Sequence, residues 1–348
     1  MRVAIKSDSV FDRLALTFAP GLVPTPLFEG FAAMMMARTI MAATSLGVFR
    51  ALDERPDGTE GLARRLSIDP LGADVLLKAL HSIGYVEWRH GRYENTRVVE
   101  RFLLPQSRNS QERWVGEFGY DMWDTFSELE NVLRTGEPIG LHERPDDDPY
   151  WERYMRGLFD LSKLRGDFVA RSIPADSPRK LLDLAGGHGG FAMALCRRHK
   201  ELQATIVELE GAARIGRKIV EEEGMADRVE YRVGDMFELD VGDDFDIVTA
   251  FSIVHHFDRE RNVALLRRAH EALRLGGTIA VYELDRPPED KPGTQLGALD
   301  GLLFYALSGA RTYSGEEIAE WMREAGFERT KVMRPPQISG TVLVVGRA

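Results

Sequence analysis

A glycine-rich segment carries the clearest chemical signal in the chain. It reads Asp183-Leu184-Ala185-Gly186-Gly187-His188-Gly189-Gly190 and follows directly on an apolar stretch. Glycine lets the main chain turn tightly and lets a ligand lie against the backbone, where a Cβ atom would obstruct it. The next apolar stretch ends in Glu208, whose carboxylate can accept hydrogen bonds from both hydroxyls of a ribose. We therefore expect Gly186, Gly187, Gly189 and Glu208 to bind a nucleoside-containing cofactor.

Two classes of cofactor fit this segment. The run Gly187-x-Gly189-x-x-Ala192, followed by the acid Glu208, satisfies the fingerprint of a nicotinamide dinucleotide site. Asp183, however, stands ahead of the glycines, where it can hold the cationic end of a methionine moiety. No set of basic residues large enough for a pyrophosphate accompanies the loop. These features favour a sulfonium nucleoside, S-adenosylmethionine, and leave the dinucleotide as the alternative.

A second acidic motif, Gly234-Asp235-Met236-Phe237, follows the next apolar stretch. The amino group of an adenine ring donates to a carboxylate, and the faces of the ring require apolar cover. Asp235, Met236 and Phe237 supply both kinds of contact. We also assign Ser252, at the end of the following apolar stretch, to the cofactor. If S-adenosylmethionine donates its methyl group, the expected product is S-adenosylhomocysteine.

The run Ile253-Val254-His255-His256-Phe257 contains the candidate base. A histidine titrates near pH 6.5, so it can accept the proton of a phenol or enol while a methyl group is transferred in line to the oxygen. His255 is the candidate for that role, with a capping or core histidine as the alternative, and His256 is assigned to the acceptor or to structure. No metal is expected, because adjacent histidines point to opposite sides of an extended chain and the chain has no Asp-Asn pair.

Strands alternate with helices from residue 180 onward. The apolar stretches predict strands at 181–184, 204–208, 229–233, 245–251 and 278–283, and a helix capped by Asp258 that ends before Gly276-Gly277. This alternation requires a parallel, doubly wound α/β sheet of the Rossmann type, with ligands at the carboxyl ends of the strands. We assign residues 179–348 to this cofactor domain.

Residues 1–105 have a different pattern. Thr59 can cap one helix, Asp69-Pro70 opens a second, and a hairpin turns at His90-Gly91, so a mainly helical, winged-helix domain is predicted. The outward positions of the second helix include Asp74, Lys78 and His81, which bring little positive charge to a phosphate backbone. A role in pairing two subunits is favoured over DNA binding, and a winged-helix transcription regulator is the alternative.

Residues 106–178 are predicted to be a helical linker that contributes to the acceptor pocket. Aromatic and methionine side chains recur there at helical spacing, which is typical of a core as well as of a pocket. Trp123, Met155 and Phe159 are the candidates for contact with the acceptor, together with Phe304 farther along the chain. Such side chains suit a flat aromatic or polyketide-like hydroxyl compound.

Composition limits the remaining possibilities. The chain has 348 residues, a net charge of -10 and a pI near 5.4, which argue against a nucleic-acid partner. Its one cysteine, Cys196, excludes an internal disulfide and fits a buried core position. The first residues lack the apolar core of a signal peptide, and Arg38 interrupts the apolar segment 31–49, so no membrane association and a cytoplasmic location are expected.

Taken together, these motifs resemble the plant-type and bacterial small-molecule O-methyltransferases over roughly residues 28–348. The donor loop is similar at Gly186–Gly189, the adenine-side motif at Gly234–Phe237, and the segment before the substrate helices at Trp123–Leu133 and Thr135–Pro138. The resemblance implies a class I methyltransferase domain, a winged-helix dimerisation domain and a homodimer.

The resemblance also implies the roles of the catalytic residues. His255 corresponds to the general base, and Glu283 to the carboxylate that orients it, while Glu208-Leu209-Glu210 stands where the family usually has Asp-Leu-Pro. Members with a second orienting acid carry it where this chain has Ala310. That departure leaves open a relative that binds S-adenosylmethionine without methylating, such as a hydroxylase or decarboxylase.

Overall fold

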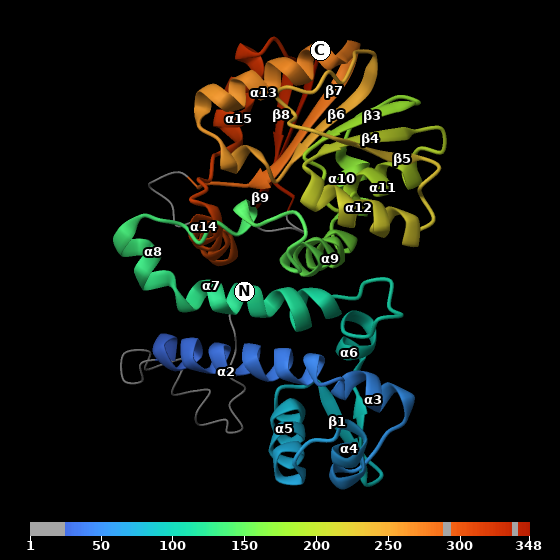
Figure 1. The fold of residues 1–348 in the computed structure, drawn as a ribbon, viewed down its shortest axis with the longest axis vertical. Coiled ribbons are helices and arrows are strands. Elements are labelled where there is room, and N and C mark those ends of the chain that lie inside the picture. The colour runs from blue at the N-terminus through green and yellow to red at the C-terminus, as the bar shows by residue number, and fades with distance from the viewer. Residues whose placement is uncertain (1–24, 288–293, 336–339) are drawn as a thin grey trace. The chain divides into compact units, whose positions relative to one another are not determined.

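The computed structural model describes residues 25–287, 294–335 and 340–348 (Figure 1). Its residues fall into two compact units, one ending at Tyr120 and the other beginning at Asp121. The expected absence of a signal peptide rests on residues outside the described ranges. The predicted division at residues 105 and 178 stays a prediction. Within the described residues no single helix is long and apolar enough to cross a membrane, although one bent pair, Glu29–Ser45 with Val48–Glu54, passes that test on length and composition.

The first unit is mainly helical and contains one hairpin. Asp69 accepts a hydrogen bond from the Gly72 N–H at 2.7 Å and caps its helix as predicted, whereas Thr59 is the first helical residue and Gly58 holds the cap position without a side chain. The described elements are α2 Thr25–Ser45, α3 Val48–Glu54, α4 Thr59–Leu66, α5 Pro70–Ser82, β1 Val86–Arg89, β2 Arg92–Asn95, α6 Arg97–Phe102 and the π-helix η1 Trp114–Phe118.

One apolar core holds this unit together. Buried side chains from α3, α4, α5 and the hairpin pack around Leu62, Leu77 and Leu80, none of which is exposed. On the outer face of α5, Lys78 donates to Asp74 at 2.6 Å. The charge of Lys78 is thus paired on this helix, and the expected absence of a DNA partner stays a prediction.

The second unit is built on a sheet of seven strands in the order β5-β4-β3-β6-β7-β9-β8. Five adjacent strands, β5 to β7 in this order, are parallel as predicted, but β9 lies antiparallel between β7 and β8. The strands are β3 Lys180–Leu184, β4 Gln203–Glu208, β5 Val229–Val233, β6 Phe245–Phe251, β7 Leu273–Leu284, β8 Glu328–Met333 and β9 Thr341–Arg347. Strand β7 begins five residues earlier than predicted, because Leu273 already pairs with Phe245 across a register shift.

Helices pack against this sheet on either side of its centre. Helices α11 and α12 contact β4 and β5, whereas α13 contacts β6 and β7, and α15 contacts β8 and β9 (Figure 1). The helices are α7 Gly119–Ser127, α8 Leu129–Thr135, η2 Leu141–Glu143, α9 Tyr150–Lys163, α10 Gly166–Ser172, α11 Gly190–Arg198, α12 Glu210–Glu222, η3 Val254–His256, α13 Arg259–Ala272, α14 Gln295–Ser308 and α15 Gly315–Glu324.

The strand order places the predicted motifs side by side. From β3 the chain moves outward through β4 and β5, and it then returns to the other side of β3 as β6. The loops that follow β3 and β6 therefore diverge at the carboxyl ends of these strands, which is where open α/β sheets bind ligands. The glycine segment follows β3, and the histidine pair follows β6.

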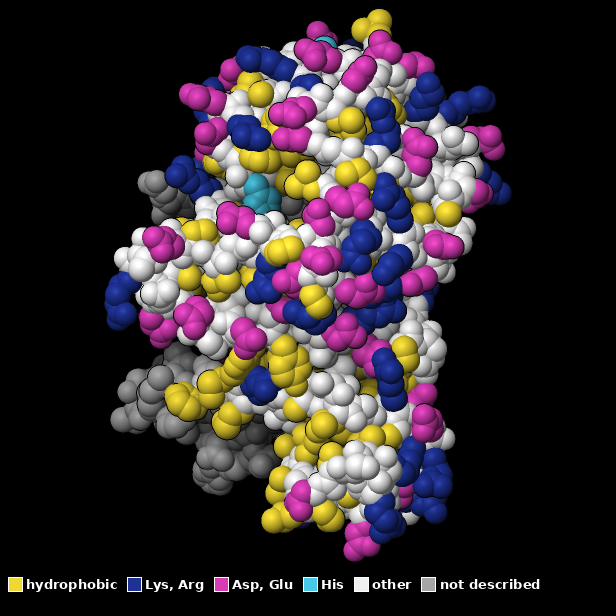
Figure 2. Space-filling view, in the orientation of Figure 1, with side chains coloured by type: hydrophobic (Ala, Val, Ile, Leu, Met, Phe, Trp, Pro, Cys, Tyr) yellow, Lys and Arg dark blue, Asp and Glu magenta, His cyan; other side chains and the backbone are white. Residues whose placement is uncertain are grey.

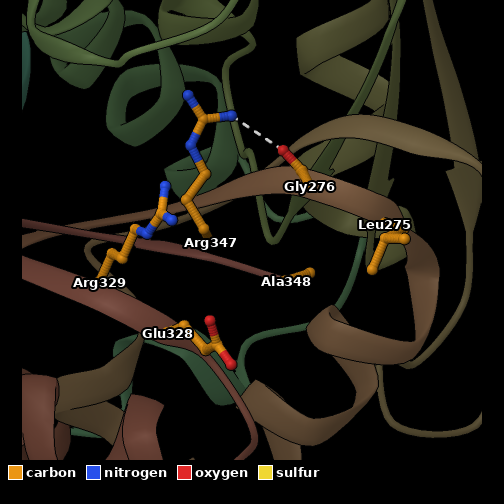
Figure 3. A pocket seen from close by; sticks show the side chains of 6 residues that line it. All are labelled: Leu275, Gly276, Glu328, Arg329, Arg347 and Ala348. Carbon is orange, nitrogen blue, oxygen red and sulfur yellow. Dashed lines mark hydrogen bonds between the residues drawn. The ribbon is translucent and has the colours of Figure 1, made fainter.

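A hollow of about 340 Å³ lies at the other end of the strands, where the parallel strand β7 begins (Figure 3). It is lined by the start of β7, the start of β8 and the end of β9, and the Arg347 guanidinium donates to the Gly276 carbonyl at 2.8 Å. Because β7 runs away from this end, the hollow is remote from the carboxyl ends of the parallel strands. It holds none of the predicted site residues.

Candidate active site

The glycine segment forms a tight turn between β3 and α11. Gly187 and Gly189 have φ angles of +51° and +71°, in the left-handed region that favours glycine. A Cβ atom on Gly189 would lie 2.8 Å from the Tyr231 hydroxyl oxygen, and that hydroxyl donates to the Gly187 carbonyl at 2.8 Å. A Cβ on Gly186 would collide with the Asp183 carboxylate. The turn is thus fixed by close packing from below as well as by its own conformation.

Asp183 supports this turn from beneath. Its side chain is 2% exposed, and its Oδ1 accepts a hydrogen bond from the Thr249 hydroxyl at 2.7 Å. Burial raises the pKa of Asp183; the hydrogen bond from Thr249 lowers it and the charge of Glu208 raises it, and the pKa that results is about 7. The predicted contact with a cationic group stays a prediction. The buried carboxyl group packs against Gly186 and so helps to fix the turn.

Glu208 ends β4 beside the same turn. Its Oε2 accepts from the Gly187 N–H at 3.0 Å, and its Oε1 accepts from the Leu209 N–H at 2.8 Å. Burial raises its pKa, and the two backbone hydrogen bonds oppose that shift. Each carboxylate oxygen has a further lone pair, so a carboxylate fixed in this way can accept from two vicinal hydroxyls. These residues fit the ribose of a nucleoside.

The acidic motif Gly234–Phe237 follows β5 as predicted. Asp235 accepts from the Phe237 N–H at 2.8 Å, which closes a turn at the end of the strand. Met236 is 9% exposed, and the Phe237 ring lies edge-on to Phe257 with centroids 5.2 Å apart. Ser252, in the next loop, is exposed at a φ angle of +52°. The acid and its apolar neighbours therefore lie together, and their contact with adenine stays a prediction.

His255 and Glu283 meet across the ends of β6 and β7. The His255 Nδ1 lies 2.9 Å from Oε2 and 3.1 Å from Oε1 of Glu283, and the Val254 N–H donates to Oε1 at 3.0 Å. The two side chains are 6% and 3% exposed. Since a carboxylate only accepts, the proton of a neutral imidazole is drawn to Nδ1. The Nε2 atom is then a proton acceptor, as a general base requires.

A second orienting acid does not contact this pair among the described residues. Ala310, the position at which the resemblance places that acid, is 7% exposed, and the next residue, Arg311, donates its N–H to the His255 carbonyl at 3.0 Å. Two other acids are candidates to replace it, Asp285 and Asp300. Asp285 accepts from Arg334 and from the Gly315 N–H. Burial raises the pKa of Asp300, and the charge of Arg165 opposes that shift.

The predicted acceptor residues reach two parts of the site. The Phe304 ring lies 4.5 Å from the His255 ring, and the His256 ring lies 4.2 Å from it on centroid distance. Met155 is buried, and its sulfur would lie 3.6 Å from a Cβ on Gly187, while Phe159 is buried with its ring 6.1 Å from His188. Trp123 is half-buried on α7, and its role stays a prediction.

Comparison with known proteins decides between the cofactor classes. A family model described as an O-methyltransferase domain matches residues 129–328. The chain belongs to this O-methyltransferase family. As its family shows, it is an S-adenosylmethionine-dependent O-methyltransferase, so the nicotinamide alternative and the transcription regulator are set aside.

Three similar proteins illustrate the range of the family. A 3-hydroxy-5-methyl-1-naphthoate 3-O-methyltransferase from Streptomyces sahachiroi is 29% identical and covers 92% of this chain and 94% of its own length. An aclacinomycin 10-hydroxylase from Streptomyces purpurascens is also 29% identical, over 83% of this chain and 81% of its own. The crystal structure of human N-acetylserotonin methyltransferase with S-adenosylmethionine matches with a TM-score of 0.81 at 20% identity, covering 98% and 99%.

Two residues of this methyltransferase site have no signal in the sequence. The Asn262 side-chain amide donates to the carbonyls of Val254 and Phe257, at 2.9 and 3.1 Å, and so holds both ends of the histidine loop. His142, in η2, lies with its ring 5.1 Å from that of His256. Asn262 lies within an ordinary helical pattern, and the segment around His142 has no periodicity. Neither residue can therefore be recognised as a site residue from the sequence.

A metal site has no support among the residues that the structure describes. No group of three or more histidine, cysteine, aspartate or glutamate side chains is arranged there to hold an ion. The expected independence from metal remains a prediction.

Proposed function

We propose that this O-methyltransferase methylates a hydroxyl group of a small aromatic or polyketide-like metabolite, with His255 as the general base. The observation that supports this most directly is the buried pair of His255 and Glu283, with Nδ1 2.9 Å from Oε2, on a loop next to the glycine turn. Bound S-adenosylmethionine would supply an electrophilic methyl group. Glu208 would hold the ribose of this cofactor. The glycine turn at 186–189 would let the cofactor lie against the main chain.

The chain's own residues then have two tasks. The first is to hold the acceptor oxygen in line behind the methyl group, a task for the apolar side chains of Met155, Phe159 and Phe304. The second is to take up the proton that the hydroxyl loses, which His255 Nε2 accepts while Glu283 stabilises the resulting imidazolium. Glu283 is a positioning residue, because it acts through His255.

Magnitudes indicate which task matters more. Orientation of two reactants supplies roughly 7–11 kcal/mol of barrier reduction in favourable cases. A positioned base raises the rate on the order of 10²–10⁴-fold, which corresponds to a smaller reduction of the barrier. The alanine at position 310 therefore weakens the smaller of the two contributions. O-methylation remains the favoured chemistry.

The acceptor class rests on the apolar character of the site and on the naphthoate specificity named for one relative. The test is transfer of a labelled methyl group to a library of aromatic alcohols, run beside calorimetric titration with S-adenosylhomocysteine. Transfer to the hydroxyl of one or more compounds supports the proposal. Binding of the nucleoside without transfer to any of them contradicts it.

That negative result would favour the second candidate function. The alanine at 310 and the 29% identity to an aclacinomycin 10-hydroxylase both point to a cofactor-binding relative with other chemistry. Its signature is tight binding of S-adenosylmethionine together with conversion of an acceptor that gains no methyl group. Mass spectrometry of the product separates the two functions.

We also propose a homodimer formed through the first unit. Helix α2 exposes a row of large apolar side chains, with Phe31, Met34 and Met35 exposed by 61%, 45% and 56%, and Figure 2 shows hydrophobic side chains gathered over this helix. Exposed apolar patches of this kind are typical of subunit interfaces. We expect Met35→Glu to shift the protein from dimer to monomer in light scattering, whereas Glu29→Lys on the same helix leaves the mass unchanged. A wild-type monomer would refute the dimer.

The cytoplasmic location, and the absence of nucleic-acid and membrane partners, remain predictions.

A further inference from the structure

His142 carries a buried polar atom that no described residue satisfies. Its Nε2 is shielded from solvent and has no hydrogen-bond partner among the described residues. Leaving a buried donor or acceptor unsatisfied costs about 1–3 kcal/mol. A site that keeps such an atom beside its catalytic residues is suited to a ligand that brings the missing partner.

The ring of His142 continues a row of imidazoles that starts at the base. His256 lies 4.2 Å from His255 on ring centroids, and His142 lies 5.1 Å from His256 in an edge-to-face arrangement of 76°. On its other side, the His142 ring lies 5.2 Å from Tyr154 and stacks on Trp151 at 6.5 Å. Aromatic rings thus surround the imidazole of His142, next to the pair of His255 and His256.

Both outer imidazoles are neutral at neutral pH. Burial lowers the pKa of His142 to about 4, and the neighbouring His255 adds to this effect. Burial and the two neighbouring histidines hold the pKa of His256 far below its usual range. A neutral imidazole has one N–H donor and one acceptor nitrogen, so it suits an uncharged oxygen such as a hydroxyl or a carbonyl.

We infer that His142 is a specificity-determining residue, whose Nε2 hydrogen-bonds a second oxygen on the aromatic ring system that carries the methylated hydroxyl. This inference rests on the proposed function, since it needs an aromatic acceptor at His255. The acceptor is a better occupant than the cofactor because His142 packs on His256, next to the base. The proposed ribose and adenine contacts belong to Glu208 and Asp235, which follow other strands.

The test compares acceptors with one and two oxygens in matched variants. His142→Phe keeps the ring against Tyr154 and His256 but removes the nitrogen, and His142→Gln returns an amide near the position of Nε2. His199→Phe is the control, because the Nε2 of His199 is also buried without a described partner, but that residue precedes β4, at the opposite edge of the sheet. Each variant is assayed for kcat and KM with naphthol and with the dihydroxynaphthalene isomers, and for its affinity for S-adenosylhomocysteine.

We expect the wild type to prefer at least one dihydroxynaphthalene isomer over naphthol by about tenfold or more in kcat/KM, since sites that hydrogen-bond a substrate oxygen discriminate strongly against its loss. In His142→Phe that preference falls about tenfold, mainly through KM, while naphthol is methylated within about threefold of the wild-type rate. His142→Gln recovers most of the preference, and His199→Phe behaves as the wild type. Thermal melting checks that each variant is folded.

Three outcomes overturn the inference. If His142→Phe and His142→Gln both keep the wild-type preference, the nitrogen does not contact the acceptor, although the proposed O-methylation stands. If both lose affinity for S-adenosylhomocysteine and keep the preference, the residue serves the cofactor. If the wild type methylates no aromatic alcohol, the proposed function fails, and the role of His142 fails with it.

Discussion

The proposed cofactor half and the proposed acceptor half of the site are held in different ways. Around the glycine turn, backbone groups hold the geometry: the N–H groups of Gly187 and Leu209 fix Glu208, and the Gly187 carbonyl is held by Tyr231. Around His255, side chains hold the geometry through the carboxylate of Glu283 and the rings of His256 and Phe304.

This difference separates what is constant from what is adjustable. A backbone cradle depends on conformation, so few substitutions are tolerated there, and one shape serves one cofactor. A site lined by side chains changes with each substitution while the strands beneath it stay in place. The acceptor half is therefore where family members with different substrates are expected to differ. The following predictions test the contrast, from the largest expected effect to the smallest.

The largest effect is expected on the cofactor side. Glu208→Ala should weaken binding of S-adenosylhomocysteine by at least about 100-fold, because hydrogen bonds to a charged group contribute about 1.5–3 kcal/mol each. Calorimetric titration measures the change. Glu210→Ala, an exposed carboxylate two positions along the chain, is the control and should bind as the wild type does. Equal affinity in both variants would mean that Glu208 does not hold the ribose.

The acceptor side should respond in turnover and not in cofactor affinity. We expect His255→Ala to lower kcat at least about tenfold, since the proton of the hydroxyl loses its acceptor, while the Kd for S-adenosylhomocysteine stays within a few-fold. Single-turnover transfer of a labelled methyl group measures the rate. Unchanged turnover would reject His255 as the base.

Glu283→Gln tests the orientation of that base. The amide retains an acceptor for the Val254 N–H, but its NH₂ group faces Nδ1 and drives the imidazole proton to Nε2. We expect kcat to fall by about tenfold or less, with partial recovery at higher pH, where a substrate hydroxyl ionises without help. Glu316→Gln, on the surface of α15, serves as the control. A flat pH profile identical to that of the wild type would argue that Glu283 is only structural.

The smallest effect concerns Asp183. Its folded-state pKa of about 7 lies above its ordinary value of 3.8, so the folded protein retains a proton that the unfolded chain has already lost. Stability from this group therefore falls as the pH rises from about 4 to about 7. Affinity for the cationic cofactor changes in the opposite direction, and we expect it to rise a few-fold between about pH 6 and pH 8.

Asp183→Asn is the variant that isolates this effect. The variant should remove both trends: its affinity for S-adenosylmethionine should vary less with pH than that of the wild type, and its melting temperature should fall less across this range. Titrations at several pH values in one buffer series measure the first trend, and calorimetric melting measures the second. Identical pH dependence in variant and wild type would show that another group titrates.

The sequence predicted the parts of this site that depend on local order along the chain. Glycines after one strand, acids after the next two, and histidine after the fourth all lie at carboxyl ends, so the parallel topology alone brings Gly187, Glu208 and His255 to one edge. Glu283 followed from the resemblance, and the structure brings it to His255 as that resemblance implies. The family and the fold class are confirmed.

The remainder depends on contacts between distant segments. Insertion of β9 between β7 and β8 leaves no trace in a local apolar pattern, because an antiparallel strand buried on both faces reads like a parallel one. The early start of β7 at Leu273 depends on pairing with Phe245 across the sheet. His142 reaches His256 only because the chain brings η2 beside η3, and no spacing rule connects two segments so far apart in the sequence.

The Asn262 amide has a consequence for how this enzyme changes over time. By bonding the carbonyls of Val254 and Phe257, it fixes the backbone on both sides of the histidine pair from a neighbouring helix. The shape of that loop is thus set independently of the side chains that it displays. We therefore expect position 256 to accept a new side chain without a new loop conformation. With His256 at the proposed acceptor site, such a substitution would offer evolution, or a protein engineer, a direct route to a different substrate.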